Sequence, residues 1–258
     1  MPQTKIVFFD IDGTLIDMQA KKITPKMLET LHRLQDRGIK ICIATGRSPM
    51  VLPKIDGVAF DAYLTFNGSL CYDRKGVIFS NPIPHKDVVR FIQNAAALGR
   101  PVCVSTRGRL AANGTDTDLT DYFFIANEPV PVADDFDAVC AEDIYQLMLG
   151  CRPKDYPALL DGAPGAKIAA WWDRAVDVIP AGGGKGIGIE KMLAYYGLDK
   201  AEALAFGDGN NDREMLQAVG TGVAMENGSP ELKAIADEIC GPVYEDGIYH
   251  YCADKGLI

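Results

Sequence analysis

The stretch Phe8-Phe9-Asp10-Ile11-Asp12-Gly13-Thr14 is the strongest single indication of the fold. It follows the short apolar run Ile6–Phe9, which predicts a buried strand, and it ends in a Gly-Thr turn. Residues two apart in an extended chain share a face, so the carboxylates of Asp10 and Asp12 are expected to point into one site at the end of this strand. Two like charges this close are costly unless a cation lies between them or one keeps its proton. The simpler alternative is an acidic turn that only caps the strand.

The composition is that of an ordinary globular protein. Of its 258 residues, 48% are hydrophobic and 24% are charged, which suffices for one large or two smaller domains with proper cores. The formal net charge of -9 argues against a nucleic-acid-binding protein, because no basic surface is available to neutralise phosphates. It does not exclude a small phosphorylated substrate, since one metal ion and one lysine can reverse a local field.

The cysteines and the apolar runs bear on where the protein works. The seven cysteines are odd in number, none forms a CxxC pair, and several lie in apolar runs, which favours a reducing compartment. No signal peptide is evident, because the first apolar run is followed at once by Asp10. No run approaches the ~18 apolar residues that a membrane span needs. We therefore expect a soluble cytoplasmic protein, with no membrane, nucleic-acid or protein partner implied.

The order of the predicted elements indicates an α/β core. A helix is expected at 24–38, and the apolar run at 39–44 predicts a strand of a sheet covered on both sides. Strand, helix and strand within about 45 residues form a βαβ unit, so the sheet should be parallel there. The chain at 45–49 is expected to turn into another helix, and a third strand with an appended hairpin is expected at 62–79.

The sequence pattern changes between residues 82 and 182, where prolines and acidic residues separate irregular apolar runs. Segments rich in proline or glycine, at 81–84 and 179–184, are typical of linkers. After the second linker, predicted strands and helices alternate again as they do in the N-terminal part of the chain. We therefore predict a doubly wound, mainly parallel, Rossmann-like core sheet formed by residues 1–81 and 183–258, with residues 82–182 inserted as an α+β cap domain.

Four short elements close a predicted strand or open a helix at one edge of that sheet. They are Asp10/Asp12, Thr45, Lys185 and Asp208/Asp212. Mg2+ prefers one or two carboxylates together with waters and phosphate oxygens, and a hydroxyl and an ammonium would complete a site for phosphoryl transfer. Taken singly, each element has a simpler explanation as a helix cap, a solvated lysine or an acidic turn. A lysine at a helix N-terminus opposes the helix dipole, however, and this indicates a functional reason for Lys185.

These elements resemble the four motifs of the haloacid dehalogenase (HAD) superfamily, in the order and spacing of its phosphatases. DIDGT (10–14) is similar to the first motif, ATGR (44–47) to the second, GGGKG (182–186) to the third and GDGNND (207–212) to the fourth. The insert resembles the large α/β cap, of C2 type, of the Cof-like branch, which hydrolyses sugar phosphates and related metabolites. The likeness covers both core segments, whereas the cap is matched by its position and size alone.

The resemblance implies a catalytic role for four residues. Asp10 would be the nucleophile that takes the phosphoryl group as an aspartyl phosphate. Asp12 would protonate the leaving oxygen and then activate water for the second step. Thr45 and Lys185 would hold and neutralise the phosphoryl oxygens. A carboxylate nucleophile of this kind splits hydrolysis into two easier steps.

The resemblance also implies residues that bind phosphate and metal. The phosphate-binding set would be Thr45, Gly46, Arg47, Lys185 and Asn211, although Arg47 has the alternative role of capping its own loop. The Mg2+ set would be Asp10, Asp12 through its backbone carbonyl, Asp208, and Asp212 as a supporting residue. We therefore expect a Mg2+-dependent phosphatase of a small phosphorylated metabolite, with a sugar phosphate as the first candidate.

Two other functions stay open at this point. A phosphosugar mutase of the phosphomannomutase type has a similar cap, but GDGNND and GGGKG are more similar to the hydrolases. A non-catalytic sensor of phosphorylated metabolites would keep the site for binding, yet binding alone needs no proton donor at Asp12. The sequence does not determine which cap residues contact the substrate, and the candidates are Arg107, Arg109, Trp171, Trp172, Asp173 and Arg174.

Overall fold

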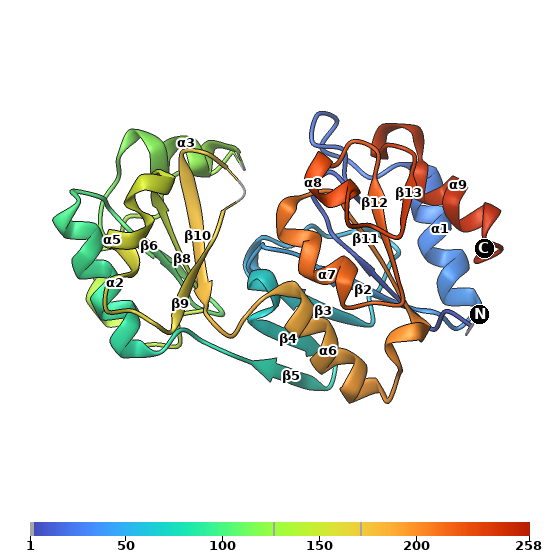
Figure 1. Cartoon of the computed structure of the whole chain (residues 1–258), viewed down its shortest axis with the longest axis horizontal. Coiled ribbons are helices and arrows are strands. Elements are labelled where there is room, and N and C mark those ends of the chain that lie inside the picture. The colour runs from blue at the N-terminus through green and yellow to red at the C-terminus, as the bar shows by residue number, and fades with distance from the viewer. Residues whose placement is uncertain (1–2, 126, 171) are drawn as a thin grey trace. The chain divides into compact units, whose positions relative to one another are not determined.

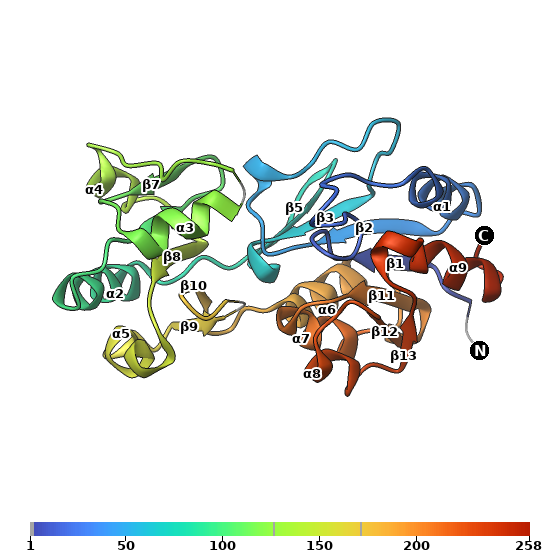
Figure 2. The same ribbon diagram turned by 90° about the horizontal axis from the view of Figure 1, so that it is seen from above.

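The structure is a computed structural model that describes residues 3–125, 127–170 and 172–258, so that Trp171 lies outside the described residues. Figures 1 and 2 together label its helices and strands. The chain divides into two compact units. The first comprises residues 1–47, 53–80 and 184–258, and the second comprises residues 48–52 and 81–183.

The first unit is built on an eight-stranded sheet of order β13-β12-β11-β1-β2-β3-β4-β5. The strands are β1 (Ile6–Phe9), β2 (Lys40–Ala44), β3 (Ala62–Thr65), β4 (Leu70–Asp73), β5 (Gly76–Ser80), β11 (Ala203–Gly207), β12 (Thr221–Met225) and β13 (Glu238–Cys240). All neighbours from β13 to β3 are parallel, and β4 and β5 add an antiparallel hairpin. The predicted mainly parallel α/β core is confirmed, although β13 was not expected from the sequence.

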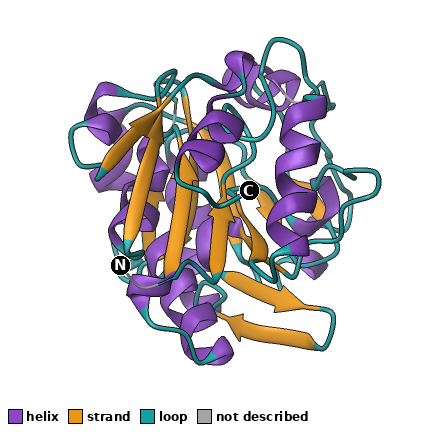
Figure 3. Ribbon diagram, turned by 90° about the vertical axis from the view of Figure 1, so that its right-hand side faces the viewer, coloured by secondary structure: helices purple, strands orange, loops and turns teal. Residues whose placement is uncertain are grey.

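Helices cover both faces of this sheet (Figures 2 and 3). They are α6 (Lys185–Tyr196), α7 (Arg213–Gln217) and α8 (Pro230–Lys233) on one face, and α1 (Pro25–Asp36) and α9 (Gly247–Asp254) on the other. Side chains alternate along a strand, so Ile6 and Phe8 pack into the core cluster of α6, α7 and α8. Phe9 points the other way and stacks on Phe206 at 5.5 Å, and Phe206 in turn meets Tyr251 of α9. Burial on both faces explains why β1 and β11 are continuously apolar.

The helix predicted at 24–38 is present as α1, but the helix predicted after 45–49 is only a short 3-10 helix. Helix α1 begins where the Thr24 hydroxyl accepts a hydrogen bond from the amide of Met27, as an N-cap should. After β2 the chain forms only the short 3-10 helix η1 (Pro49–Val51), so the expected α-helix is wrong. Pro53 follows closely and lacks the amide hydrogen that a longer helix would need there.

The second unit contains a five-stranded antiparallel sheet of order β7-β6-β8-β10-β9. Its strands are β6 (Cys103–Ser105), β7 (Leu110–Ala112), β8 (Gln146–Gly150), β9 (Ala166–Ala169) and β10 (Ala175–Pro180), and its helices are α2 (His85–Ala97), α3 (Thr117–Ile125), α4 (Phe136–Val139) and α5 (Tyr156–Leu160). Helices α2, α4 and α5 share one apolar cluster and α3 belongs to another. Strand β10 includes two residues of the expected linker at 179–184, because Pro180 still pairs with Ala166.

The cysteines serve as core residues. All seven are free thiols and all are buried. Burial raises the pKa of Cys71 to about 12, so this thiol stays protonated and unreactive near neutral pH. Within the described ranges, no helix has both the length and the apolar character to cross a membrane.

Candidate active site

The charged motifs meet at the carboxyl ends of two neighbouring parallel strands. Strand β1 pairs with β11 in register Phe9↔Phe206, so the loops that begin at Asp10 and Asp208 leave the sheet side by side. The amide of Asp10 continues this pairing, since it donates to the carbonyl of Phe206 at 3.0 Å. Ligands bind at this edge of open parallel sheets, and the sequence placed both acidic loops there.

Lys185, the first residue of α6, lies between two of these carboxylates. Its Nζ donates to Oδ1 of Asp10 at 2.6 Å and to Oδ1 of Asp212 at 2.5 Å, and its side chain is fully buried. Burial alone would lower the pKa of Lys185, but the charges of Asp10 and Asp212 outweigh it and raise the pKa above its ordinary value. The charged ammonium form of Lys185 is therefore favoured near neutral pH. Its position explains why a cation is tolerated at a helix N-terminus.

The described residues hold one cluster of carboxylates with the spacing of a metal site. One oxygen each of Asp10, Asp208 and Asp212 lie within 4.8 Å of one another. Asp208 also accepts from the Thr14 hydroxyl at 3.1 Å, and Asp212 accepts from the amides of Asp208 and Gly209 at 3.0 Å. The side chain of Asp12 is not part of this cluster, so its backbone carbonyl remains the predicted metal contact.

The cluster carries more negative charge than Lys185 can balance. Burial, reinforced by the neighbouring carboxylates, raises the pKa of Asp10 well above its usual range despite the attraction of Lys185. Burial and then the charge of Asp212 raise the pKa of Asp208 to about 7. A divalent cation among these oxygens would remove the repulsion. The donor set therefore fits a hard metal ion that prefers oxygen ligands.

Gly13 allows the first acidic loop to pass against the second. Its φ of 85° lies in the left-handed region, and a Cβ at this position would come within 2.2 Å of Oδ2 of Asp208. A larger residue would therefore push Asp208 away from Asp10. Glycine is therefore required at position 13 by the close approach of Asp208, which is 195 residues away in the sequence, as well as by the turn itself.

The structure pairs Arg47 with Asp12, a contact that the sequence did not predict. The guanidinium donates from Nε to Oδ2 at 2.8 Å and from Nη2 to Oδ1 at 2.6 Å, and each side chain is about one-third exposed. Both oxygens of Asp12 are thus engaged by a planar fork that only arginine provides. Thr45, which is buried, accepts from the amide of Arg47 at 3.1 Å. A direct contact of Arg47 with phosphate stays a prediction.

The site also includes Asn67, which the sequence indicated only as a turn residue. The amide of Asn211 donates from Nδ2 to Oδ1 of Asn67 at 3.3 Å. A Cβ on Gly46 would lie 3.1 Å from Nδ2 of Asn67, so the second and fourth motifs both approach this side chain. One signal could have revealed it. Asn67 follows β3, a parallel strand whose carboxyl end lies at the same sheet edge as those of β1 and β2.

Several candidate substrate-binding residues of the second unit are engaged in ion pairs there. Arg109 forms a two-pronged pair with the exposed Asp135. Arg174 pairs with Asp121 at 2.8 Å and lies over the ring of Trp172 at 4.4 Å. Contacts of these residues with a substrate stay predictions, as do those of Arg107 and Asp173.

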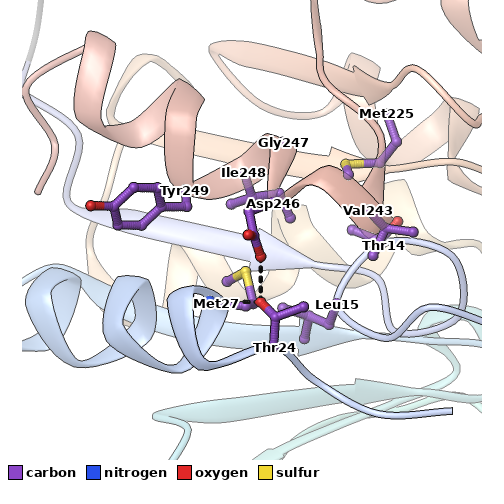
Figure 4. A pocket seen from close by; sticks show the side chains of 10 residues that line it. All are labelled: Thr14, Leu15, Thr24, Met27, Met225, Val243, Asp246, Gly247, Ile248 and Tyr249. Atoms are coloured by element: carbon purple, nitrogen blue, oxygen red, sulfur yellow. Dashed lines mark hydrogen bonds between the residues drawn. The ribbon is translucent and has the colours of Figure 1, made fainter. Parts of the chain in front are cut away.

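A small pocket is lined in part by Thr14, whose hydroxyl also donates to Asp208 of the carboxylate cluster (Figure 4). Leu15, Met27 and Met225 contribute apolar surface to its lining, and none of the three clustered carboxylates does. At its edge the Thr24 hydroxyl donates to Asp246 at 2.5 Å. This contact ties the start of α1 to the turn before α9.

Comparison with known proteins agrees with the geometry. Residues 7–252 match the family model of the haloacid dehalogenase-like hydrolases. The chain is 34% identical to YkrA of Bacillus subtilis over 257 residues, which is 99% of each chain. It is 28% identical to the 5-amino-6-(5-phospho-D-ribitylamino)uracil phosphatase YitU of the same species over 262 residues, 95% of each chain. The solved structure of the sugar phosphatase BT4131, of HAD subclass IIB, is similar with a TM-score of 0.89 at 28% identity, covering 99% of this chain and 100% of that one.

Proposed function

The chain belongs to the haloacid dehalogenase-like hydrolases, and from this premise we propose that it is a Mg2+-dependent phosphatase of a sugar phosphate or a similar phosphorylated polyol. The observation that carries the proposal is the cluster of Asp10, Asp208 and Asp212 beside the fully buried Lys185, with Asp12 two residues from the nucleophile. Nucleophile, counter-charge and acid–base group are the parts that phosphoryl transfer to a carboxylate needs.

Two relatives support the substrate class. BT4131 is a sugar phosphatase, and YitU acts on a compound whose phosphate is carried by a ribityl chain. Both substrates are phosphate esters of a polyhydroxylated carbon chain. We infer the same class for this protein, in which the leaving group is an alcohol oxygen of high pKa. Such a leaving group needs a proton donor, and Asp12 would supply it.

The cofactor follows from the donor set. Asp10, Asp208 and the backbone carbonyl of Asp12 would hold Mg2+, and Asp212 would support them while it accepts from Lys185. When bound, the ion would neutralise charge on the phosphoryl oxygens and keep Asp10 ionised. Lys185 would supply a second positive charge that is already fixed in place, since its Nζ is 2.6 Å from Asp10.

In the first step a carboxylate oxygen of Asp10 would attack phosphorus. The new P–O bond makes an aspartyl phosphate, and the bond to the alcohol oxygen breaks with its electron pair. Asp12 would give its proton to that oxygen, and the neutral alcohol would leave. Because both oxygens of Asp12 accept from Arg47, the ion pair has to open at one oxygen before the group can carry and donate this proton. The Thr45 hydroxyl would hold a phosphoryl oxygen meanwhile.

In the second step Asp12 would act as a base. It would take a proton from a water molecule as the water oxygen attacks phosphorus. The bond between phosphorus and the Asp10 oxygen breaks, so that inorganic phosphate forms and the Asp10 carboxylate is restored. Arg47 would orient Asp12 in this step, since a two-pronged ion pair fixes the plane of a carboxylate.

Release of phosphate from a panel of metabolites tests the proposal. The panel would contain hexose 6-phosphates, pentitol phosphates, glycerol phosphate, pyridoxal 5′-phosphate and nucleotides, each with Mg2+ and with chelator. Wild type should release phosphate from the polyol esters, and Asp10→Asn should lose at least about 10,000-fold in kcat because the nucleophile is gone. Product analysis separates the rival functions. An isomerised sugar phosphate with little free phosphate would indicate a mutase, and ligand-induced stabilisation without turnover would indicate a sensor.

A further inference from the structure

The turn that follows β3, residues 66–68, has an unusual backbone. Phe66, Asn67 and Gly68 all have positive φ, at 52°, 51° and 91°. The left-handed region is easy for glycine and tolerated by asparagine, but it is a marked outlier for a bulky, fully buried phenylalanine. Such strain persists only where surrounding contacts hold it, and it tends to occur at functional sites.

The backbone of this turn is held between two parts of the candidate active site. On one side, the amide of Phe66 donates to the carbonyl of Arg47 and the amide of Asn67 donates to the carbonyl of Thr45, both at 3.0 Å. On the other side, a Cβ on Gly68 would lie 2.2 Å from the carbonyl oxygen of Gly184, directly before Lys185. The turn therefore joins the Thr45 loop to the helix that carries Lys185, and only glycine fits at position 68.

The side chain of Asn67 reaches a third part of the site. It is only 4% exposed, and its Oδ1 accepts from the amide of Asn211 at 3.3 Å. The carboxamide also lies against the position of Gly46, where a Cβ would be 3.1 Å from its Nδ2 and 3.2 Å from its Oδ1. The carboxamide thus lies between two residues that we expect to contact the phosphoryl group.

We propose that Asn67 is a positioning residue of the active site. Its carboxamide fixes the amide of Asn211 at the phosphoryl position, and the left-handed turn keeps that amide in register with the Thr45 loop and with Lys185. This inference rests on the proposed phosphatase function, since it concerns the same reaction. The simpler explanation is that asparagine stands at this position only because it tolerates a positive φ.

Glycine at position 67 separates the two explanations, because it adopts the same backbone but has no carboxamide. Asn67→Gly should change the melting temperature little, because relief of the left-handed backbone offsets the loss of the buried carboxamide. It should lower kcat about tenfold and change KM less than about threefold, the scale of one lost neutral hydrogen bond in the reacting geometry. Asn127→Gly is the matched control, because Asn127 also has a positive φ, 58°, but lies in the second unit. This control should leave kcat and KM unchanged.

A double-variant comparison tests whether Asn67 acts through Asn211. Asn211→Ala should lose at least as much kcat as Asn67→Gly, and the two changes together should cost no more than Asn211→Ala alone, because they remove one contact. Losses that multiply would contradict this route. Wild-type kcat in Asn67→Gly would show that the residue only forms the turn, and the proposal would then be wrong.

Binding of orthovanadate with Mg2+ gives a readout that does not need turnover. The rise in melting temperature that this phosphoryl mimic causes should be smaller in Asn67→Gly than in wild type and in Asn127→Gly. Equal shifts in all three proteins would overturn the role of Asn67. If wild type releases no phosphate from any substrate, the proposed function fails, and the vanadate shifts still decide the role of Asn67. No vanadate shift in wild type would overturn both.

Discussion

Each unit contains a cluster of aspartates with basic residues. The two clusters differ in their balance of charge and in how exposed their basic side chains are. The first cluster consists of Asp10, Asp208, Asp212 and Lys185. The second consists of Asp116, Asp118, Asp121, Arg100, Arg152 and Arg174. In the first, carboxylates outnumber the single buried ammonium. In the second, three carboxylates face three arginines whose side chains are 29%, 35% and 38% exposed.

The difference appears in the direction of the pKa shifts. Burial raises the pKa of Asp10 and of Asp208, whereas the hydrogen bond from Arg152 lowers the pKa of Asp118. A balanced, partly exposed network satisfies its own charges and needs no ligand. An unbalanced, buried cluster is stable only with protons or a cation, and it is the kind of site that binds metal and does chemistry. The following changes test this contrast.

The largest effect is expected from Lys185→Met. Asp10 and Asp212 would lose their buried counter-charge, so the free energy of unfolding should fall by about 3–5 kcal/mol at neutral pH without metal. Phosphatase activity should be lost with it. Urea denaturation would measure the change, with Arg152→Met as the matched variant of the second cluster. Because Asp118 keeps Arg100, the Arg152 variant should be clearly more stable than the Lys185 variant, and equal losses would contradict the contrast.

The next effect concerns pH and metal. Burial raises the pKa of Asp208 from its ordinary value of 3.8 to about 7 in the metal-free folded state, so this state binds an extra proton between those two pH values. The contribution of Asp208 to metal-free stability should therefore be fully present below pH 4 and be lost as pH rises through about 7. Mg2+ should restore it, more at pH 8 than at pH 5, because the ion requires the deprotonated carboxylates.

Asp208→Asn is the control for this pH dependence. The variant keeps the shape of the side chain and cannot lose a proton. Its metal-free melting temperature should exceed that of wild type at pH 8, and its response to Mg2+ should be weak. If the variant is less stable than wild type at pH 8, or responds fully to Mg2+, then excess negative charge is not what destabilises the metal-free cluster.

A smaller effect is expected from Arg47→Gln, which breaks the ion pair with Asp12. Because we assign Arg47 to orient the proton donor, kcat should fall by about tenfold to hundredfold for alkyl phosphates, whose leaving oxygen needs a proton. For p-nitrophenyl phosphate, whose leaving group needs none, the loss should be much smaller. Steady-state kinetics on both substrates would measure the ratio. An equal loss on the two would indicate that Arg47 binds phosphate rather than orients Asp12.

The smallest effect on activity is expected from Asp118→Asn in the second cluster. Because the hydrogen bond from Arg152 lowers the pKa of Asp118 in the folded state, its stabilising contribution is present above its ordinary pKa of 3.8 and is lost as pH falls through the folded pKa. The variant should therefore be less stable than wild type at pH 7, and the difference should shrink in acid. Its kcat on the preferred substrate should stay close to wild type. Thermal denaturation at pH 3 and pH 7 would check the stability difference.

Much of the core could be predicted because its signals are local. The end of β1 at Phe9, the N-cap of α1 at Thr24 and the start of α6 at Lys185 all follow from short apolar runs and cap residues. The carboxyl ends of parallel strands share one edge of a sheet, so the strand pattern also placed Asp10 and Asp208 in one site. The prediction of a helix after 45–49 was wrong for two reasons. Pro53 follows closely, and the carbonyls of Thr45 and Arg47 accept hydrogen bonds from the turn at 66–68.

The sequence by itself therefore determined the fold class, the family resemblance and the identity of the charged residues in the site. Only the tertiary structure decided which of those residues touch. The ion pair of Arg47 with Asp12 and the contact of Asn67 with Asn211 join positions 35 and 144 residues apart. Local propensity acts over a few residues, whereas such contacts depend on how loops from different strands pack and on the direction of each side chain. Asp10 and Asp118 are the same amino acid, and their surroundings in the fold move their pKa values in opposite directions.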